Sequence, residues 1–426
     1  YIAAGAAGMY CGSCLHDNTL ASALLDLGEE VTLVPTYTPI RTDERDVSQR
    51  RVFFGGINVY LQQHVPLLRH TPKWLDRWLD HPALLRAITG RAAAVDPQRL
   101  GDLTVSMLRG EAGHQRKELE HLVNWLLDEV QPDVIHLSNS MLLGMARWFR
   151  QRCGPPVVCA VSGEDSFLER LPNSHYREAR RLLNERASEV DAFTALNTFY
   201  ADHMAGYLNV DRNRFHVIPH GLNLAGHGSR QTTEQAALRR VGFLARVCHD
   251  KGLHLLVEAC ERLAQDENLP SFTLRAAGYL GPAERSYLRD IEFRVANGPL
   301  RSRFEYVGEV DREGKIKFLQ SLDVFALPTT IAEPKGLPAL EALANAVPVV
   351  APEHGCFPEL LSDTGGGLLC APGSSADLAE KISVLLSDDR AAAERGRAGQ
   401  HAIRDRYHAA AMAQQTRQLY RSLIES

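Results

Sequence analysis

The feature that most constrains the fold of this chain is an alternation of short β-branched runs with longer helical stretches, which continues through most of its 426 residues. Parallel strands need a crossover of a dozen or more residues between them, usually a helix, so the alternation predicts parallel sheets with helices on both faces. A single hydrophobic core rarely extends over a chain of this length. We therefore expect an α/β protein with two doubly wound domains.

The strand candidates fall into two successive groups. In the first half they lie at 31–35, 52–53, 59–61, 134–137, 157–161 and 193–196, and residues 1–4 have the composition of a strand end. Crossover helices are expected among them at 16–27, 114–130 and 174–188. The second half begins a new alternation, with strand candidates at 215–218, 241–244, 272–277, 304–307, 324–327, 347–351 and 367–370.

Domain boundaries follow from the same pattern. Residues 66–112 contain amphipathic segments and no strand signal, which predicts a helical insertion in the first domain. The hinge is expected near Pro219, ahead of a polar loop that contains glycine. The predicted divisions are 1–218 for the first domain, 219–400 for the second, and 401–426 for a C-terminal helical segment able to return to the first domain.

Composition argues against several classes of protein. The formal charge of -5 gives no reason to expect a nucleic acid as partner, because a protein surface that binds the negative phosphate backbone is usually positively charged. The apolar runs are far shorter than the roughly 18 residues of a membrane-spanning helix, and the opening residues lack the pattern of a signal peptide. The dispersed cysteines indicate reduced thiols. We expect a cytoplasmic protein, with peripheral contact at the inner membrane face as the less favoured alternative.

The segment that follows residue 328 carries the clearest signal for a ligand. A buried strand leads into a loop that turns at Gly336, and Pro338 stands where a proline fits the first turn of a helix. The amides around Gly336 and Leu337, together with the positive end of the helix, suit a diphosphate or a sugar hydroxyl.

Two carboxylates flank this turn. Glu333 lies in the loop and Glu341 about one turn inside the helix, so they can contact different parts of one ligand. A carboxylate at position 341 can accept two hydrogen bonds from a ribose diol. The alternative is that Glu341 only caps or solvates an early helix turn and Glu333 is a surface loop acid, and only the neighbouring motifs favour the ligand.

A second polar loop follows the strand at 241–244 and contains Arg246 and Lys251. Ligands of doubly wound sheets bind beyond the carboxyl ends of the strands, where these cations suit a diphosphate leaving group. Solvated loop charge is the alternative interpretation.

Taken together, the motifs of the second half resemble the nucleotide-sugar domain of the family 4 glycosyltransferases, which are retaining enzymes of the GT-B fold. The matching stretches, in the order of the family, are VIPHG at 217–221, VGFLAR at 241–246 with KG at 251–252, AAG at 276–278, YVG at 306–308, DVFALP at 323–328 and the segment 333–341. The resemblance implies two Rossmann-like domains that face a cleft, with a UDP- or GDP-linked sugar as donor.

The resemblance also implies roles for individual residues. Arg246 and Lys251 would hold the diphosphate and, with Glu333, take part in catalysis. Glu333 would contact the donor sugar and Glu341 the ribose. No metal and no cofactor is implied, and the sequence has no Asp-x-Asp run in a suitable loop.

The turn between the two glutamates contributes further donor contacts by the same resemblance. Gly336, Leu337 and Pro338 would lie against the phosphates and the sugar. Pro334 and Lys335 depart from the aromatic or small residue that is usual in the family, and Lys335 is expected to add positive charge near the phosphates.

The first half matches the family less closely. A glycine-rich stretch that includes Gly8 and Gly12 resembles the loop that approaches donor and acceptor, although such a loop also suits a dinucleotide. Cys11 and Cys14 form a Cys-x-x-Cys pair, for which packing is favoured over a metal or redox role because no second pair completes a tetrahedral site.

Two other features of the first half leave alternatives open. Ser162 stands where many relatives carry a histidine that helps to bind the donor sugar, and Glu164 or Asp165 either takes its place or begins the next helix as an N-terminal acid. Trp74 and Trp78 suit core packing, which is favoured, or a membrane surface or acceptor groove.

The expected function is retaining, metal-independent transfer of a sugar to an acceptor hydroxyl, in the synthesis of a glycan, polysaccharide or glycolipid. The partners would be a nucleotide sugar and a sugar, glycan or lipid-linked acceptor. The alternatives are a nucleotide-sugar epimerase or hydrolase of the same fold and a non-catalytic nucleotide-sugar binding protein.

Overall fold

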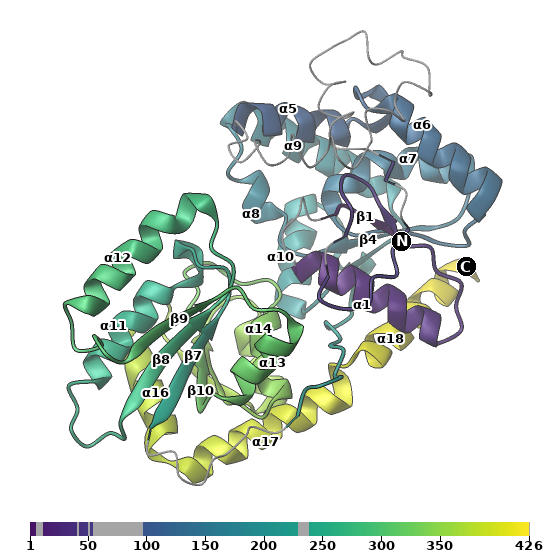
Figure 1. Ribbon diagram of the computed structural model, residues 1–426. Coiled ribbons are helices and arrows are strands. Elements are labelled where there is room, and N and C mark those ends of the chain that lie inside the picture. Colours follow the sequence, from purple (N-terminus) through teal and green to yellow (C-terminus); the bar gives the residue numbers. More distant parts are fainter. Residues whose placement is uncertain (6–11, 41, 50–51, 54–96, 229–237, 426) are drawn as a thin grey trace. The chain divides into compact units, whose positions relative to one another are not determined.

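The computed structural model describes residues 1–5, 12–40, 42–49, 52–53, 97–228 and 238–425 (Figure 1). The chain divides into a first unit, Tyr1–Pro219 with Ala410–Ser426, and a second unit, His220–Ala409. Each unit contains one parallel six-stranded sheet. The predicted pair of doubly wound α/β domains is therefore confirmed.

The sheet of the first unit has the strand order β2-β1-β3-β4-β5-β6. The strands are β1 Ile2–Ala3, β2 Val34–Pro35, β3 Ile135–Leu137, β4 Val157–Val161, β5 Ala192–Ala195 and β6 Phe215–Val217. The α-helices are α1 Gly12–Asp26, α5 Pro97–Leu108, α6 Arg116–Trp125, α7 Ala146–Trp148, α8 Asp165–Leu168, α9 Asn173–Arg186, α10 Thr198–Leu208 and α18 Ala409–Ile424. Figure 1 shows α5, α6, α7 and α9 on one side of this sheet and α1 and α18 on the other.

Burial explains why the central strands are readable from the sequence. All five residues of β4 are buried, which is the pattern of a parallel strand covered on both faces. A run of apolar residues such as VVCAV suits a strand of this kind.

Two predicted strands, one from each half, differ in the structure. Residues 52–53 form no strand, and the Phe53 ring instead packs 4.9 Å from the Trp125 ring, so its hydrophobicity reflects core packing. The segment 215–218 does not start the second sheet, because β6 pairs with β5 in the first one. The predicted strand at 59–61 and most of the helical insertion at 66–112 lie outside the described residues, and the described part of that insertion, 97–112, is largely helical.

The sheet of the second unit has the order β12-β11-β10-β7-β8-β9. The strands are β7 Arg239–Leu244, β8 Phe272–Ala277, β9 Phe304–Gly308, β10 Val324–Ala326, β11 Val349–Pro352 and β12 Gly367–Cys370. The α-helices are α11 Leu253–Leu263, α12 Arg285–Ala296, α13 Arg312–Gln320, α14 Leu337–Ala344, α15 Phe357–Thr364, α16 Ser375–Ser387 and α17 Asp389–Arg406. The chain leaves β7 toward β8 and β9 and later returns to its other side with β10, so the order reverses between β7 and β10. Such a reversal is where doubly wound sheets open a crevice for a ligand.

The C-terminal helices show where the chain returns to the first unit. Helix α17 belongs to the second unit, and a side chain at Gly396 would come within 2.2 Å of the Ala346 carbonyl oxygen. The return therefore begins at Ala410, later than the predicted 401, because α17 packs too closely on its own domain to leave it. In the first unit, α18 places the Tyr420 hydroxyl 2.5 Å from His136 Nδ1.

Candidate functional site

Three loops of the second unit meet beyond the carboxyl ends of β7, β10 and β11. The Thr330 amide donates to the Asp250 carbonyl at 2.9 Å, which joins the first two loops. The Cys356 amide donates to the Glu333 carbonyl at 2.8 Å, which joins the third. The reversal point of the sheet is therefore built from loops that are hydrogen-bonded to one another.

Two glycines allow this close approach. Gly252 has a φ of +76°, and a Cβ there would lie 1.8 Å from the Pro328 carbonyl oxygen. Gly336 has a φ of +65°, and a Cβ there would lie 2.9 Å from the Cys356 sulfur. Side chains at either position would separate the loops and strain the backbone.

Lys251 and Glu333 form an ion pair across the reversal point, with their side chains 20% and 8% exposed. Burial by itself raises the pKa of Glu333, but the Lys251 ammonium, together with Lys335, outweighs burial and holds the pKa below its ordinary value. The Lys335 backbone amide also donates to this carboxylate. The structure thus brings together three residues that the sequence predicted, Lys251, Glu333 and Lys335.

Glu341 lies on α14 and forms a second ion pair that the sequence analysis missed. Its Oε1 is 2.7 Å from Nζ of Lys315 on α13, and the two side chains are 5% and 12% exposed. Nothing in the sequence distinguishes Lys315 from other helical lysines, because the pair exists only through the packing of α13 on α14. A carboxylate with one lysine partner retains acceptor capacity for a ligand.

The start of α14 has the predicted geometry. Gly336 occupies the N-cap in the left-handed region, and Pro338 lies in the first turn. The first amides of a helix have no intrahelical partner, so those of Gly336 and Leu337 are available by geometry to an anion. Arg246 lies just after β7 with an exposed side chain.

Two further polar atoms at this edge were not predicted. The Thr329 hydroxyl and His354 Nδ1 are buried, and neither has a hydrogen-bond partner among the described residues. The other ring nitrogen of His354 lies 3.0 Å from the Thr329 carbonyl oxygen, so the two residues support each other. Buried polar groups normally have partners, so these atoms are candidate contacts for a ligand.

The acidic side chains of the first unit have different hydrogen-bond partners. Glu164 is buried and accepts from the amides of Ser140 at 2.9 Å and Ser162 at 2.7 Å, which ties the loops after β3 and β4 together. It stands at the N-cap of α8 but makes no capping hydrogen bond, so the expected N-terminal acid has a different structural role. A part for Glu164 in place of a histidine at position 162 stays a prediction.

Asp165 belongs to a small polar cluster with two residues of α10. It accepts from the Tyr200 hydroxyl at 2.6 Å and lies 3.0 Å from Nε2 of His203. The hydrogen bond that His203 donates to Asp165 raises the pKa of His203. Burial raises the pKa of Asp165, but hydrogen bonds from His203 and Tyr200 outweigh it and lower the pKa.

The structure describes only some of the other residues that were singled out in the first half. Gly8, Cys11, Trp74 and Trp78 lie outside the described residues, and Gly12 is the first residue of α1. Within the ranges that the structure describes, no group of three histidine, cysteine or acidic side chains has the arrangement of a metal site.

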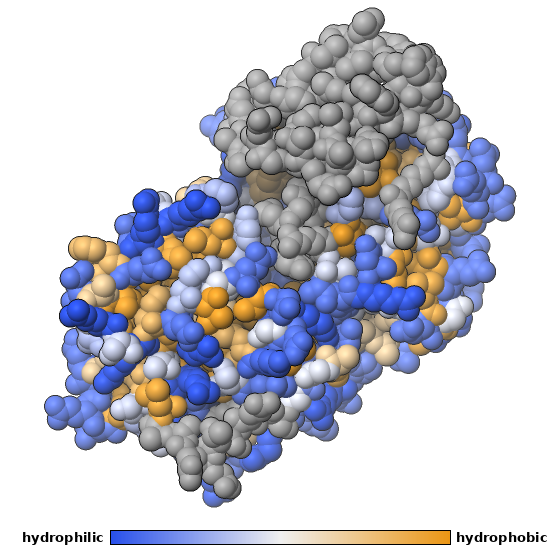
Figure 2. Space-filling model, in the orientation of Figure 1, coloured by the Kyte–Doolittle hydropathy of each residue, from blue (hydrophilic) through white to orange (hydrophobic). Residues whose placement is uncertain are grey.

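Among the described residues, no helix combines the length and apolar character that a bilayer-spanning segment requires. The visible face in Figure 2 mixes polar and apolar residues over both units.

Two family profiles match the chain. Residues 18–221 match the profile described as "Glycosyl transferase 4-like domain", and residues 229–402 match "Glycosyl transferases group 1". The two matches lie almost wholly in the first and second unit respectively.

Curated relatives carry related names. The chain is 28% identical to the alpha-maltose-1-phosphate synthase of Mycolicibacterium smegmatis over 252 residues, which cover 55% of this chain and 63% of that protein. It is 27% identical to the phosphatidyl-myo-inositol mannosyltransferase of Mycobacterium leprae over 307 residues, 71% of this chain and 76% of that protein. The chain thus spans under two thirds of the first relative and about three quarters of the second.

A solved structure shares the fold. Anabaena HepE, crystallised in complex with UDP, superposes with a TM-score of 0.62 at 22% identity, over 72% of this chain and 82% of HepE. At this identity the likeness concerns the fold alone, which is of the GT-B class.

Proposed function

We propose that this chain, which belongs to the GT-B glycosyltransferases with 4-like and group 1 domains, transfers a sugar from a nucleotide diphosphate sugar to an acceptor hydroxyl with retention of configuration. The observation that carries this proposal is the pair of lysine-glutamate contacts at the reversal point of the second sheet, Lys251 with Glu333 and Lys315 with Glu341. Each places a buried carboxylate, suited to sugar hydroxyls, at an edge where doubly wound sheets bind ligands.

In this proposal Glu341 binds the ribose of the donor. A carboxylate accepts two hydrogen bonds from a vicinal diol, and the Lys315 contact leaves acceptor positions of Glu341 open. UDP and GDP share this diol, so the contact serves either base. The UDP complex of the structural neighbour HepE favours UDP as the first nucleotide to test.

The diphosphate is assigned to the positive groups around the same turn. Arg246, Lys251 and Lys335 carry the charge, and the amides of Gly336 and Leu337 point from the start of α14. These fixed donors stabilise the negative charge that develops on the departing diphosphate, so we propose that transfer needs no metal ion.

The reaction breaks the bond between the anomeric carbon and the diphosphate oxygen and forms a bond from that carbon to the acceptor oxygen on the same face. The acceptor proton passes to the departing nucleoside diphosphate. Glu333 contacts the donor sugar, and its pairing with Lys251 couples that contact to the diphosphate site. The acceptor is a sugar, glycan or lipid-linked hydroxyl, and its binding is assigned to the first domain.

The experiment is a thermal-shift screen against UDP, GDP, ADP and their common sugars, with and without EDTA. The wild type should be stabilised by one class of nucleotide through mass action, with or without EDTA. Glu341→Ala should reduce the shift, whereas Glu380→Ala, which removes a 66% exposed glutamate from α16, should not.

Turnover assays separate the alternatives. Product that appears only with an acceptor supports transfer, and analysis of its anomeric configuration tests retention. Release of free sugar or of an epimer without acceptor indicates a hydrolase or epimerase, and binding without turnover indicates a binding protein. If no nucleotide stabilises the wild type, the donor assignment fails.

A further inference from the structure

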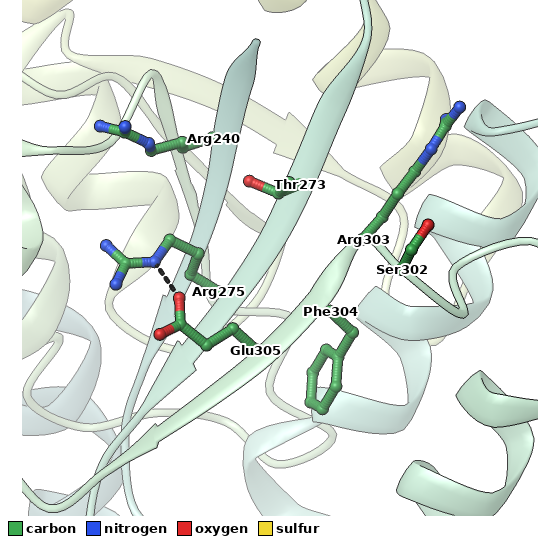
Figure 3. Close-up of a pocket in the computed structure, with 7 residues that line it drawn as sticks. All are labelled: Arg240, Thr273, Arg275, Ser302, Arg303, Phe304 and Glu305. Carbon is green, nitrogen blue, oxygen red and sulfur yellow. Dashed lines mark hydrogen bonds and ion pairs between the residues drawn. The ribbon is translucent and has the colours of Figure 1, made fainter.

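A polar pocket outside the candidate functional site, with a volume of about 450 Å³, opens on the sheet of the second unit (Figure 3). It lies at the amino ends of β7, β8 and β9, whereas the loops of the donor site follow the carboxyl ends. A six-residue strand such as β8 is about 20 Å long, so the two sites are at opposite edges of the sheet. The proposed glycosyl transfer uses none of the residues that line this pocket.

Strand register places arginines around one threonine. Arg240 on β7 pairs with Thr273 on β8, and Leu274 pairs with Phe304 on β9. The Arg303 carbonyl accepts from the Leu274 amide at 2.7 Å, so Arg303 stands opposite Thr273 from the other side. Paired residues of a sheet point to the same face, so Thr273 has an arginine on each side.

A third arginine lies on the same face. Arg275 is two residues beyond Thr273 and pairs with Glu305. Its Nε is 2.7 Å from a Glu305 carboxylate oxygen, and its Nη1 donates to the Ser321 hydroxyl at 3.1 Å. Figure 3 shows the Arg240 and Arg275 side chains on one side of Thr273 and the Arg303 side chain on the other.

The charges of this face do not balance. Three guanidinium groups line the pocket against one carboxylate, Glu305, which is 57% exposed and held by Arg275. Like charges at neighbouring positions of a sheet face repel, so the arrangement costs stability unless an anion is present. The hydroxyl groups of Thr273 and Ser302 add neutral donors to the same pocket.

We propose that this arginine pocket, formed by Arg240, Thr273, Arg275 and Arg303, binds the phosphate group of a soluble phosphate ester. Guanidinium groups match phosphate oxygens with parallel hydrogen bonds, and arginines lie on both sides of Thr273 in the same pocket. Because this pocket lies at the sheet edge opposite the donor loops, its ligand would be a second molecule, distinct from the nucleotide sugar.

Isothermal titration of the full chain with inorganic phosphate and with a hexose phosphate tests the proposal. Arg303→Ala and Arg240→Ala should each weaken binding about tenfold or more, because each removes a charge-assisted contact. Arg301→Ala is the matched control, since it removes an exposed arginine that does not line the pocket, and its affinity should equal that of the wild type. Arg303→Gln provides a second variant should truncation to alanine impair folding.

Lys251→Ala distinguishes the two edges. Phosphate binding that survives in Lys251→Ala and is lost in the pocket variants supports the arginine pocket, whatever the fate of the donor assignment. Binding that is lost only in Lys251→Ala, or that is equal in all variants, overturns it. Vesicles with and without phosphatidic acid test the other source of phosphate, and arginine-dependent vesicle binding without binding of either soluble probe would also overturn the proposal.

Discussion

The carboxyl edges of the two sheets hold their buried carboxylates in different ways. In the second unit, Glu333 and Glu341 pair with the side chains of Lys251 and Lys315. In the first unit, Glu164 accepts from two backbone amides of neighbouring loops. The partners are lysine side chains in the second unit, joined at Glu333 by the Lys335 backbone amide, and backbone amides at Glu164 in the first.

This difference suits the second edge to ligand binding and the first edge to a structural role. A lysine can move aside or share its carboxylate when a ligand hydroxyl arrives, because its long side chain has many rotamers. Backbone amides cannot leave without breaking the loop that carries them. The comparison therefore predicts that changes at the second edge affect turnover, whereas changes at the first edge affect stability.

The largest expected effect is on turnover at the second edge. Arg246→Ala should lower kcat by about 10²- to 10³-fold, because a fixed donor to the leaving diphosphate is lost. Its side chain is exposed, so the melting temperature should change by no more than about 2 °C. Steady-state kinetics and calorimetry measure the two quantities, with the exposed Arg285→Ala on α12 as control. Undiminished kcat in a folded Arg246→Ala protein would remove Arg246 from the mechanism.

The second effect is on stability at the first edge. Glu164→Ala should lower the free energy of unfolding by about 2–4 kcal/mol, because two buried amides lose their acceptor. Denaturant titration measures this loss, and Glu169→Ala, an exposed acid nearby, should lie within about 0.5 kcal/mol of the wild type. A stable Glu164→Ala protein that has lost turnover would instead make Glu164 part of the ligand site and break the comparison.

A smaller effect is expected on donor affinity. Glu341→Ala should weaken nucleotide binding about tenfold or more through the loss of the ribose contact. The 2′-deoxy nucleotide should bind the wild type less well than the ribonucleotide but should bind Glu341→Ala equally well, because the hydroxyl then has no partner to lose. A full 2′-deoxy penalty in the variant would place the ribose elsewhere.

The smallest effect concerns pH at the first edge. Because Asp165 raises the pKa of His203 above its value in the unfolded chain, their contact contributes fully below about pH 6.5 and is lost as pH rises through the folded-state pKa. His203 is 40% exposed, so the stabilisation should not exceed about 1 kcal/mol. The difference in unfolding free energy between wild type and His203→Gln should shrink from pH 6 toward about pH 8. A difference that grows in that interval would contradict the ion pair.

The sequence predicted some strands to the residue whether they are fully or only partly buried. The predicted 157–161 coincides with β4, whose five residues are all buried, and the predicted 367–370 with β12, of which only Cys370 is buried. Local composition failed at Phe53, whose apolar ring serves a contact with Trp125 and no strand. A hydrophobic residue indicates that its position is buried. It belongs to a strand only when neighbouring strands provide backbone hydrogen-bond partners.

The sequence by itself determined the two α/β domains, the boundary near Pro219 and the loops that contain Lys251, Glu333 and Glu341, because alternation and turn chemistry are local properties. Only the tertiary structure decided which residues meet. Lys315 reaches Glu341 through the packing of two helices, and Arg240, Thr273 and Arg303 share one face through strand register. These contacts join residues distant in the chain, and their energies depend on positions in space that local sequence does not encode.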